Sequence, residues 1–303
     1  MPGRAAAQAG RARRIRAGAF PYALILPMAI LMAGISFYPT LYALYLSLTN
    51  ASLLRLDRAL FIGLGNFRRM LADPIYLDAL WRTLRWDLVV VGSELLVAIP
   101  MALFLNLSFR GRGLLRSAIL VPYILPPAVT ALIWVYMLDG NFGIVNDLLL
   151  RLGLIDHGIA WLSDPLGAFG AVSSAMVWSG QPLMTIVILA ALQAIPDTLY
   201  EAASIDGAGA WRRFVHVTWP HILPTVLFLT LMRMIWMSNH IDMIFIMTGG
   251  GPGFSNYTMS VYSFVQTTRF NIGYATAIAV SLAAVLMLAS LFYVRHLARK
   301  ILA

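Results

Sequence analysis

Four stretches of this chain contain no charged residue, and each is long enough to cross a lipid bilayer as a helix. They lie between Arg16 and Arg55, Arg116 and Asp139, Asp164 and Asp197, and Arg269 and Arg295. A helix needs about 20 apolar residues to cross the hydrocarbon core. Only 12% of the 303 residues are charged, against roughly 25% in soluble domains, and the mean hydropathy is +0.79. These features exclude a water-soluble fold and indicate an all-α, polytopic membrane protein.

Two further apolar stretches carry isolated charges, Glu94 in one and Arg233 with Asp242 in the other. With these included, we predict a single transmembrane domain over residues 1–303 with six transmembrane helices. The predicted spans are 20–46, 84–108, 117–138, 167–192, 222–247 and 272–295, and a long loop over 193–221 joins the fourth to the fifth.

Three prolines interrupt the third predicted span: Pro122, Pro126 and Pro127. Each removes a backbone donor, so the helix must kink or break there. Such a bend serves either helix packing or the lining of a cavity, and the sequence leaves both open.

The basic residues predict the orientation. If the N-terminus is inside, the inner segments hold thirteen Lys and Arg residues and the outer loops hold eight. Inner loops carry the excess of Lys and Arg, so both termini are predicted to be cytoplasmic. The first outer loop weakens this bias, although it also holds Asp57, Asp73, Asp78 and Asp87. The net charge of +9 does not indicate a nucleic-acid partner, because the basic residues form short clusters between apolar runs.

The loop over 193–221 has the composition of two short helices joined by a hinge. Pro196 suits the first turn of a helix, and Gly207 suits its left-handed C-terminal end. A second helix is expected from about Ala210 until Pro220 stops it. Four large apolar side chains lie in this polar loop: Leu199, Trp211, Phe214 and Trp219. They predict a partner surface, or a loop that packs on its own helical bundle.

The same loop resembles the Glu-Ala-Ala signature of ABC-importer permeases. It contains Glu201-Ala202-Ala203, then Gly207 after three intervening residues, and Val217-Thr218-Trp219-Pro220 at its end. Trp219 departs from the usual Leu and puts the seating of that end in doubt. Phe61–Phe67 and the Thr248–Gly253 stretch are similar to segments of the carbohydrate-uptake group.

This resemblance implies a type I ABC-importer permease fold in the bacterial cytoplasmic (inner) membrane. It further implies that residues 201–207 form a coupling helix that docks on an ATPase subunit. The implied coupling residues are Glu201, Ala202, Ala203, Asp206, Gly207, Trp211 and Pro220.

The source of energy must lie outside this chain. A P-loop requires a Gly-Lys-Ser/Thr sequence, and the only lysine, Lys300, precedes Ile301. We therefore expect a transport subunit, not an enzyme, with no cofactor of its own and with ATP and Mg²⁺ held by a separate dimer of ATPase subunits. The other expected partners are a second homologous permease, an extracytoplasmic solute-binding protein and the lipid bilayer.

Polar residues inside the spans are the candidates for solute contact, because a charge at mid-bilayer costs roughly 2.5–3.5 kcal/mol. Arg233, Trp236, Asn239 and His240 fall within about 120° of one another at 100° per residue, so they share a helix face. A cation, a ring and an amide together suit a hydroxyl-rich or anionic solute. The alternative is that Arg233 pairs with Glu94 and only holds two helices together.

Three further residues of the predicted spans also have expected roles. Trp178 and Gln181 of the fourth span are a second cavity candidate. Asp242 is expected on the opposite side of the fifth span, where it would fix the turn over Thr248–Gly253.

The function predicted from these features is the passage of a sugar or sugar derivative across the membrane by alternating access. The alternatives are a permease for a non-sugar solute such as a glycerol phosphoester, and a stand-alone secondary transporter. Arg233 slightly favours an anionic solute. An intramembrane serine protease at Ser179 is disfavoured, because Val177 stands where such enzymes need glycine.

Overall fold

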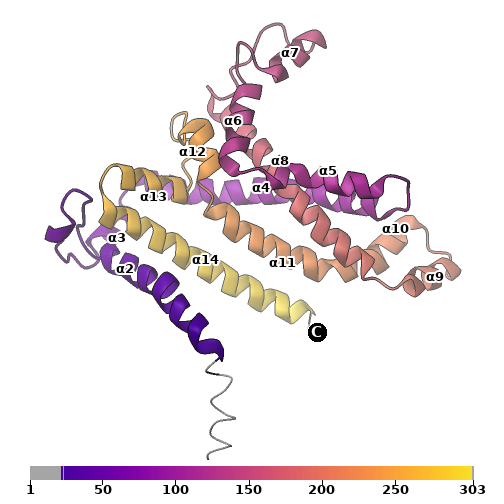
Figure 1. Ribbon diagram of the computed structural model, residues 1–303, viewed down its shortest axis with the longest axis horizontal. Helices are drawn as coiled ribbons and strands as arrows, with labels where there is room; N and C mark the ends of the chain where they lie inside the picture. The colour runs from indigo at the N-terminus through magenta and orange to yellow at the C-terminus, as the bar shows by residue number, and fades with distance from the viewer. Residues whose placement is uncertain (1–21, 23, 302–303) are drawn as a thin grey trace, which may run out of the picture.

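The computed structural model describes Tyr22 and residues 24–301 (Figure 1). Five of its helices are long and apolar enough to cross a membrane, or six if one bent pair forms a single span. After a helical stretch from Leu24 that includes a π-helical segment (Ala33–Phe37), the α-helices are α2 (Tyr38–Ser47), α3 (Gly65–Leu71), α4 (Pro74–Asn106), α5 (Arg112–Ile124), α6 (Pro127–Met137), α7 (Ile144–Arg151), α8 (Pro165–Gln193), α9 (Asp197–Ile205), α10 (Ala210–Arg213), α11 (Trp219–Ser238), α12 (Asp242–Thr248), α13 (Met259–Thr268) and α14 (Ile272–Ile301).

An Asp-Pro pair begins both α4 and α8, the two long helices that are most buried within the described part of the chain. Asp73 caps α4 by accepting a hydrogen bond from the Ile75 N–H at 2.9 Å. Asp164 caps α8 in the same way. The proline that follows each aspartate occupies the first turn, where a missing N–H costs nothing. This cap explains why α4 begins ten residues before the predicted start at 84, so that Asp78, which was counted with the first outer loop, lies inside the helix.

Helices α4 and α8 form the centre of the bundle. Their small buried residues, among them Ala98, Ala102 and Ala175, allow the two backbones to approach closely. One apolar core surrounds Trp86 and Met176, and a second surrounds Leu105 toward the other end of the same helices. The bundle is therefore packed along most of its length, which gives polar side chains between these helices fixed positions.

The third predicted span, 117–138, is sharply bent. Helices α5 and α6 meet at 93°. Leu125 and Pro126 have extended backbone conformations between them, because a residue that precedes proline is pushed out of the helical region. Neither helix has the length of a membrane span by itself, so the pair is either one broken span or a re-entrant loop.

The prediction of a continuous fifth span over 222–247 is wrong. The helix ends at Ser238, and α12 begins at Asp242. The Ser238 carbonyl accepts a hydrogen bond from the Ser260 hydroxyl at 2.5 Å, while its own hydroxyl donates to Asp87. These contacts from other elements end the helix within an apolar run whose composition gives no sign of a break.

The prediction that Pro220 ends the loop's second helix is also wrong. Helix α10 continues through a π-helical turn, Phe214–Thr218, into α11, so Pro220 lies in the first turn of α11. The wider turn accommodates a residue that has no N–H to donate.

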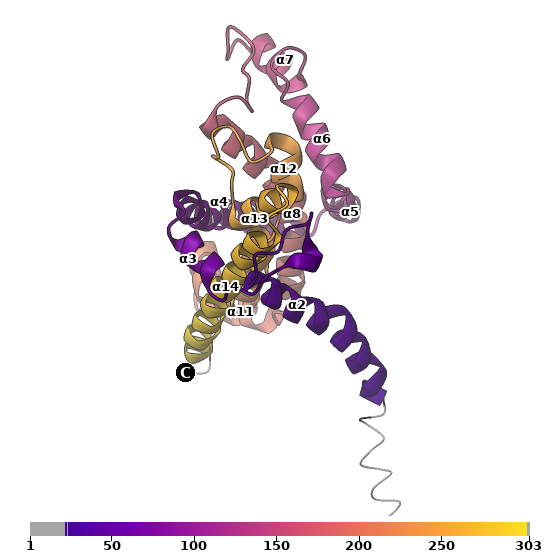
Figure 2. The same cartoon turned by 90° about the vertical axis from the view of Figure 1, so that its left-hand side faces the viewer.

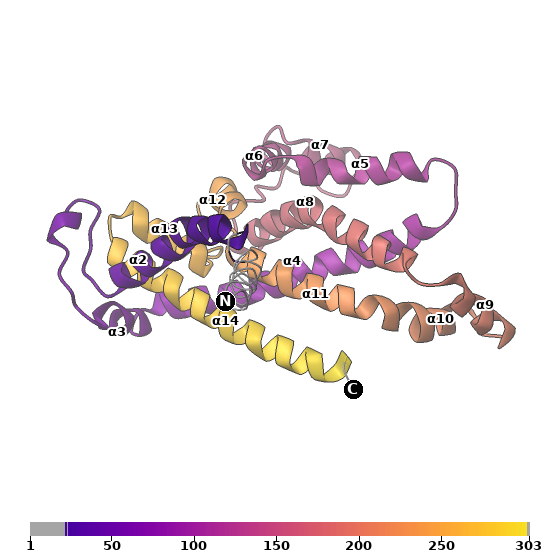
Figure 3. The same ribbon diagram turned by 60° about the horizontal axis from the view of Figure 1, so that its bottom comes forward.

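Two groups of connections mark opposite ends of the bundle, while the α6–α8 connection with α7 projects between them (Figure 1). Helices α9 and α10 lie at the same end as the turn between α4 and α5, whereas α3 and α13 lie at the opposite end (Figures 1 and 3). The first helix extends away from the bundle (Figure 2). The predicted first span begins at residue 20, and its first residues lie outside the described part of the chain. The N-terminus, which the basic residues predict to be cytoplasmic, lies outside it as well.

Candidate functional site

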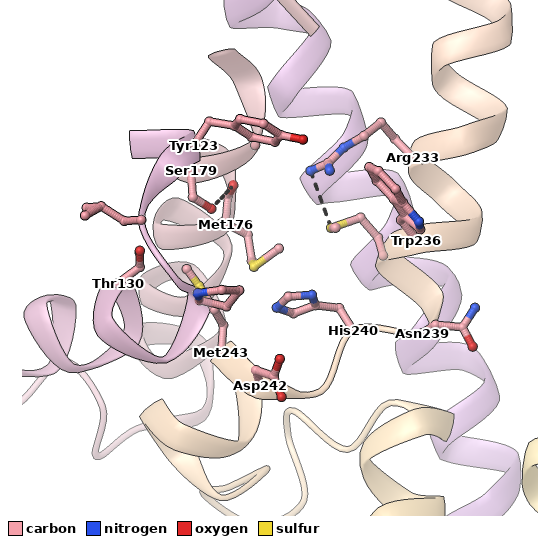
Figure 4. A pocket seen from close by; sticks show the side chains of 14 residues that line it. Tyr123, Thr130, Met176, Ser179, Arg233, Trp236, Asn239, His240, Asp242 and Met243 are labelled. Atoms are coloured by element: carbon pink, nitrogen blue, oxygen red, sulfur yellow. Dashed lines mark hydrogen bonds between the residues drawn. The ribbon is translucent and has the colours of Figure 1, made fainter. Parts of the chain in front are cut away.

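A cavity of about 540 Å³ lies where the bent α5–α6 pair faces the broken end of α11 (Figure 4). Both helix interruptions therefore contribute to one site. The residues that line it are Tyr123, Leu125, Pro127, Thr130, Met176, Ser179, Gly180, Arg233, Trp236, Met237, Asn239, His240, Asp242 and Met243.

A buried ion pair forms part of the wall of this cavity. The Arg233 Nε donates to Glu94 Oε2 at 2.8 Å, and Nη2 donates to the other carboxylate oxygen. Glu94 is fully buried and Arg233 is 5% exposed. Such a two-point contact fixes the guanidinium plane. The pairing of Arg233 with Glu94 that the sequence left open is present, and Arg233 still lines the cavity.

Gly180 of α8 provides the space for this pair. A Cβ atom at this position would overlap the Glu94 carboxylate and the Arg233 guanidinium. The pair therefore sits at a point where α4, α8 and α11 all meet.

The other residues predicted on the α11 face also line the cavity, although Asn239 and His240 lie just beyond the helix end. The Trp236 side chain is 57% exposed, and the Asn239 amide donates to the Ile235 carbonyl at 2.7 Å. In Figure 4 the His240 ring points into the cavity from the link between α11 and α12.

The prediction that Asp242 lies opposite Arg233 and fixes the Thr248–Gly253 turn is wrong. The break after Ser238 brings Asp242 into the same cavity as His240. The turn it was expected to fix is held instead by Asn256, whose backbone N–H donates to the Gly250 carbonyl and whose amide donates to the Gly251 carbonyl.

Two polar atoms of the cavity lining are buried without a hydrogen-bond partner in the described structure: Thr130 Oγ1 and His240 Nε2. Leaving such atoms unpaired costs about 1–3 kcal/mol each. They lie on opposite sides of the cavity, on α6 and on the α11–α12 link (Figure 4).

Trp178 and Gln181 face a different space. They line a groove of about 450 Å³ together with Ser93 and Val97 of α4. Trp178 packs edge-on against Trp134, and Gln181 accepts a hydrogen bond from the Thr185 hydroxyl. The structure therefore separates these two residues from the Arg233 cavity.

The residues assigned to ATPase coupling lie on α9, on the turn that follows it, on α10 and in the first turn of α11. Glu201, Ala202, Asp206, Gly207, Trp211 and Pro220 are exposed, and Ala203 is half-buried. Gly207 has a φ of +69°, which explains why glycine ends α9.

Contacts with the bundle hold α9 in place while its outer face remains free. The Tyr200 and Thr218 hydroxyls are hydrogen-bonded at 3.0 Å. Phe214 packs between Trp211 and Trp219. Trp219, the departure from the signature, packs against the second apolar core, whereas Trp211 is 75% exposed.

A polar cluster at the end of the bundle opposite α9 was missed from the sequence. Asp73 accepts hydrogen bonds from the Tyr262 and Tyr274 hydroxyls at 2.5 and 2.6 Å. Burial opposes ionisation of Asp73, but these hydroxyls and the backbone N–H groups of Ile75 and Tyr76 outweigh it and lower the pKa of the carboxyl. The Asp-Pro sequence signals the helix cap but not the tyrosines, which lie about 190 residues further along the chain.

The comparisons with known proteins agree with this arrangement. Residues 94–303 match the family described as "binding-protein-dependent transport system inner membrane component". The sulfoquinovosyl glycerol transport system permease protein SmoG of Agrobacterium fabrum is 37% identical, over 91% of this chain and 90% of its own length. The trehalose/maltose transport system permease protein MalF of Thermococcus litoralis is 33% identical, over 86% of this chain and 87% of its own.

The fold has a counterpart among solved structures. A chain of a bacterial ABC transporter involved in the import of the acidic polysaccharide alginate superposes with a TM-score of 0.77, over 96% of this chain and 99% of that chain, at 24% identity. The fold is therefore that of a type I ABC-importer permease. The family match and the relatives at 33–37% identity show that the protein is a transport subunit and not an enzyme. The chain belongs to the family of binding-protein-dependent transport system inner membrane components.

Proposed function

We propose that this chain is the permease subunit of an ATP-driven sugar importer and that its solute passes through the Arg233 cavity. The observation that carries the proposal is the exposed Trp236 ring in the same cavity as two unpaired polar atoms, Thr130 Oγ1 and His240 Nε2. An aromatic ring packs against the C–H face of a sugar, while hydroxyl groups satisfy buried donors and acceptors. The cavity volume also lies within the usual range for small-molecule sites. Relatives named for transport of trehalose, maltose and sulfoquinovosyl glycerol support the sugar class.

A second, homologous permease completes the pathway in this proposal. None of the residues in the most apolar window of Leu24–Ser47 is buried within the chain. The helix extends from the bundle, and α2 is in contact with α14 only near one end (Figure 2). In a complete importer, the second permease and lipid would cover this surface.

Energy would enter through α9. Its exposed face, together with Trp211, would dock on a dimer of ATPase subunits that hold ATP and Mg²⁺. This end of the bundle would then lie in the cytoplasm, in keeping with the orientation predicted from the basic residues, and a solute-binding protein would deliver the sugar at the end that carries α3 and α13.

Reconstituted transport tests this proposal. The permease pair, the ATPases and the binding protein would be assembled in lipid vesicles, and ATP hydrolysis measured across a panel of neutral sugars, sugar esters, amino acids and phosphate. We expect stimulation by at least one sugar or sugar ester and loss of that stimulation in Trp236→Ala. Stimulation only by amino acids or phosphate would reject the sugar class, and purification without an ATPase would reject the importer.

A further inference from the structure

We infer that the solute is uncharged, and that Glu94 and Asp242 enforce this by outweighing the single cation of the cavity. The inference rests on the proposed function, since it names the class of sugar that this site accepts. It reverses the expectation from the sequence, in which Arg233 favoured an anionic solute.

The first step concerns what Arg233 can offer. Two of its three guanidinium nitrogens, Nε and Nη2, donate to Glu94, and Nη2 also lies 3.9 Å from the Met237 sulfur. Only Nη1 has no recorded partner in the described structure. Because the carboxylate is fully buried against the guanidinium, the positive charge is compensated where it arises. Toward the cavity, Arg233 therefore acts as a hydrogen-bond donor without net charge.

The second step is the charge balance of the part of the site that this chain provides. Arg233 is the only lysine or arginine in the cavity lining, whereas Glu94 adjoins it and Asp242 lines it. One cation thus stands against two carboxylates. Protonation of His240 would bring the balance to zero but would not make it positive. An anionic solute would lose its hydration without gaining a compensating charge, which is unfavourable in a partly buried site.

The third step is that the remaining polar groups suit hydroxyl groups. Thr130 Oγ1 both donates and accepts, and His240 Nε2 does one or the other according to its tautomer. The Trp236 ring lines the same cavity from the α11 side (Figure 4). These are the groups expected around a neutral polyol or glycoside.

A matched pair of solutes tests the inference. Glucosylglycerol and sulfoquinovosyl glycerol are the same glycoside except at one position, where the first has a hydroxyl group and the second has a sulfonate. Equilibrium binding of each would be measured to the complete permease–ATPase complex in nanodiscs, without binding protein, so that only the permease site discriminates. We expect the wild type to bind the neutral glycoside about tenfold more tightly, in keeping with one charge in a site of intermediate dielectric.

A series of variants then removes the carboxylates one at a time. Asp242→Asn and Glu94→Gln should each bring the two affinities close to equality, and the double variant should favour the sulfonate. Asp242 is exposed, so Asp242→Asn is expected to fold even if Glu94→Gln does not accumulate. Asp147→Asn, on α7 outside the cavity, removes a carboxylate as a control and should leave the ratio unchanged.

The outcomes are separable. A wild type that prefers the sulfonate, or a ratio that does not move in Asp242→Asn, would overturn the charge inference while leaving sugar transport intact. If the wild type bound neither glycoside and no sugar stimulated hydrolysis in the vesicle assay, the proposed function would fail and this inference with it.

Discussion

The cavity wall and helix α9 place their charged residues in opposite settings. Glu94 and Arg233 are buried and bonded to one another across two helices, with Gly180 of a third helix against them. Glu201 on α9 is exposed, as are most residues of the coupling segment. A buried charge contributes through its partner within the chain, whereas an exposed charge on a free face contributes through a partner outside it. Substitutions in the first region should therefore change stability, and substitutions in the second should change coupling alone.

The largest expected effect is that of Arg233→Ala. It leaves the Glu94 carboxylate buried and uncompensated, at a cost of about 3–5 kcal/mol. Thermal unfolding in detergent, followed by size-exclusion chromatography, would measure the loss. The double variant Glu94→Gln/Arg233→Gln removes both charges and should recover most of the stability. A single variant as stable as the double would show that the ion pair does not hold the bundle together.

The next effect concerns the space beside this pair. Gly180→Ala would place a methyl group against the Glu94 and Arg233 side chains, and overpacking of this kind costs about 1–3 kcal/mol. Gly170 lies on the same helix with no atom within 4 Å of a Cβ placed on it. Gly170→Ala should therefore be neutral or stabilising, by about 0.5–1 kcal/mol from helix propensity. Equal unfolding temperatures for the two alanine variants would contradict the close approach at Gly180.

A smaller and pH-dependent effect is expected at Asp73. A hydrogen bond to a charged group contributes about 1.5–3 kcal/mol to stability. Because Asp73 is partly exposed, we expect Asp73→Asn to lower the free energy of unfolding by about 1–2 kcal/mol. The folded pKa of Asp73 lies below its ordinary value of 3.8. Its contribution is thus fully present above pH 3.8 and is lost as the pH falls from there through the folded pKa. Unfolding temperatures of wild type and Asp73→Asn should converge over that window; a constant difference would exclude the ionised carboxylate as the cause.

The two regions also differ in how far the sequence predicts them. The coupling residues follow one another in a single short segment, so their spacing alone indicates a family and a role. A docking role in turn predicts that their side chains are exposed. The pairing of Glu94 with Arg233 joins residues 139 positions apart, and periodicity places each on a helix without choosing its partner. The break after Ser238 depends on Asp87 and Ser260, which lie far from it in the chain. Local composition therefore predicts helices and their faces, while the cavity depends on where helices stop, which tertiary contacts decide.

The smallest effect on stability, and the sharpest separation of the two regions, is expected for Glu201→Lys. Glu201 is exposed and accepts no side-chain hydrogen bond within the described structure, so its reversal should change the free energy of unfolding by less than about 0.5 kcal/mol. Yet a lysine on the docking face of α9 would oppose any basic partner groups that Glu201 contacts, so co-purification of the ATPase and solute-stimulated hydrolysis should fall about tenfold or more. Asp57→Lys makes the same charge reversal at an exposed carboxylate in the segment between α2 and α3, and it should retain the ATPase. A lower unfolding temperature for Glu201→Lys would show that Glu201 supports the fold. Full coupling at normal stability would show that the exposed face of α9 does not dock on the ATPase.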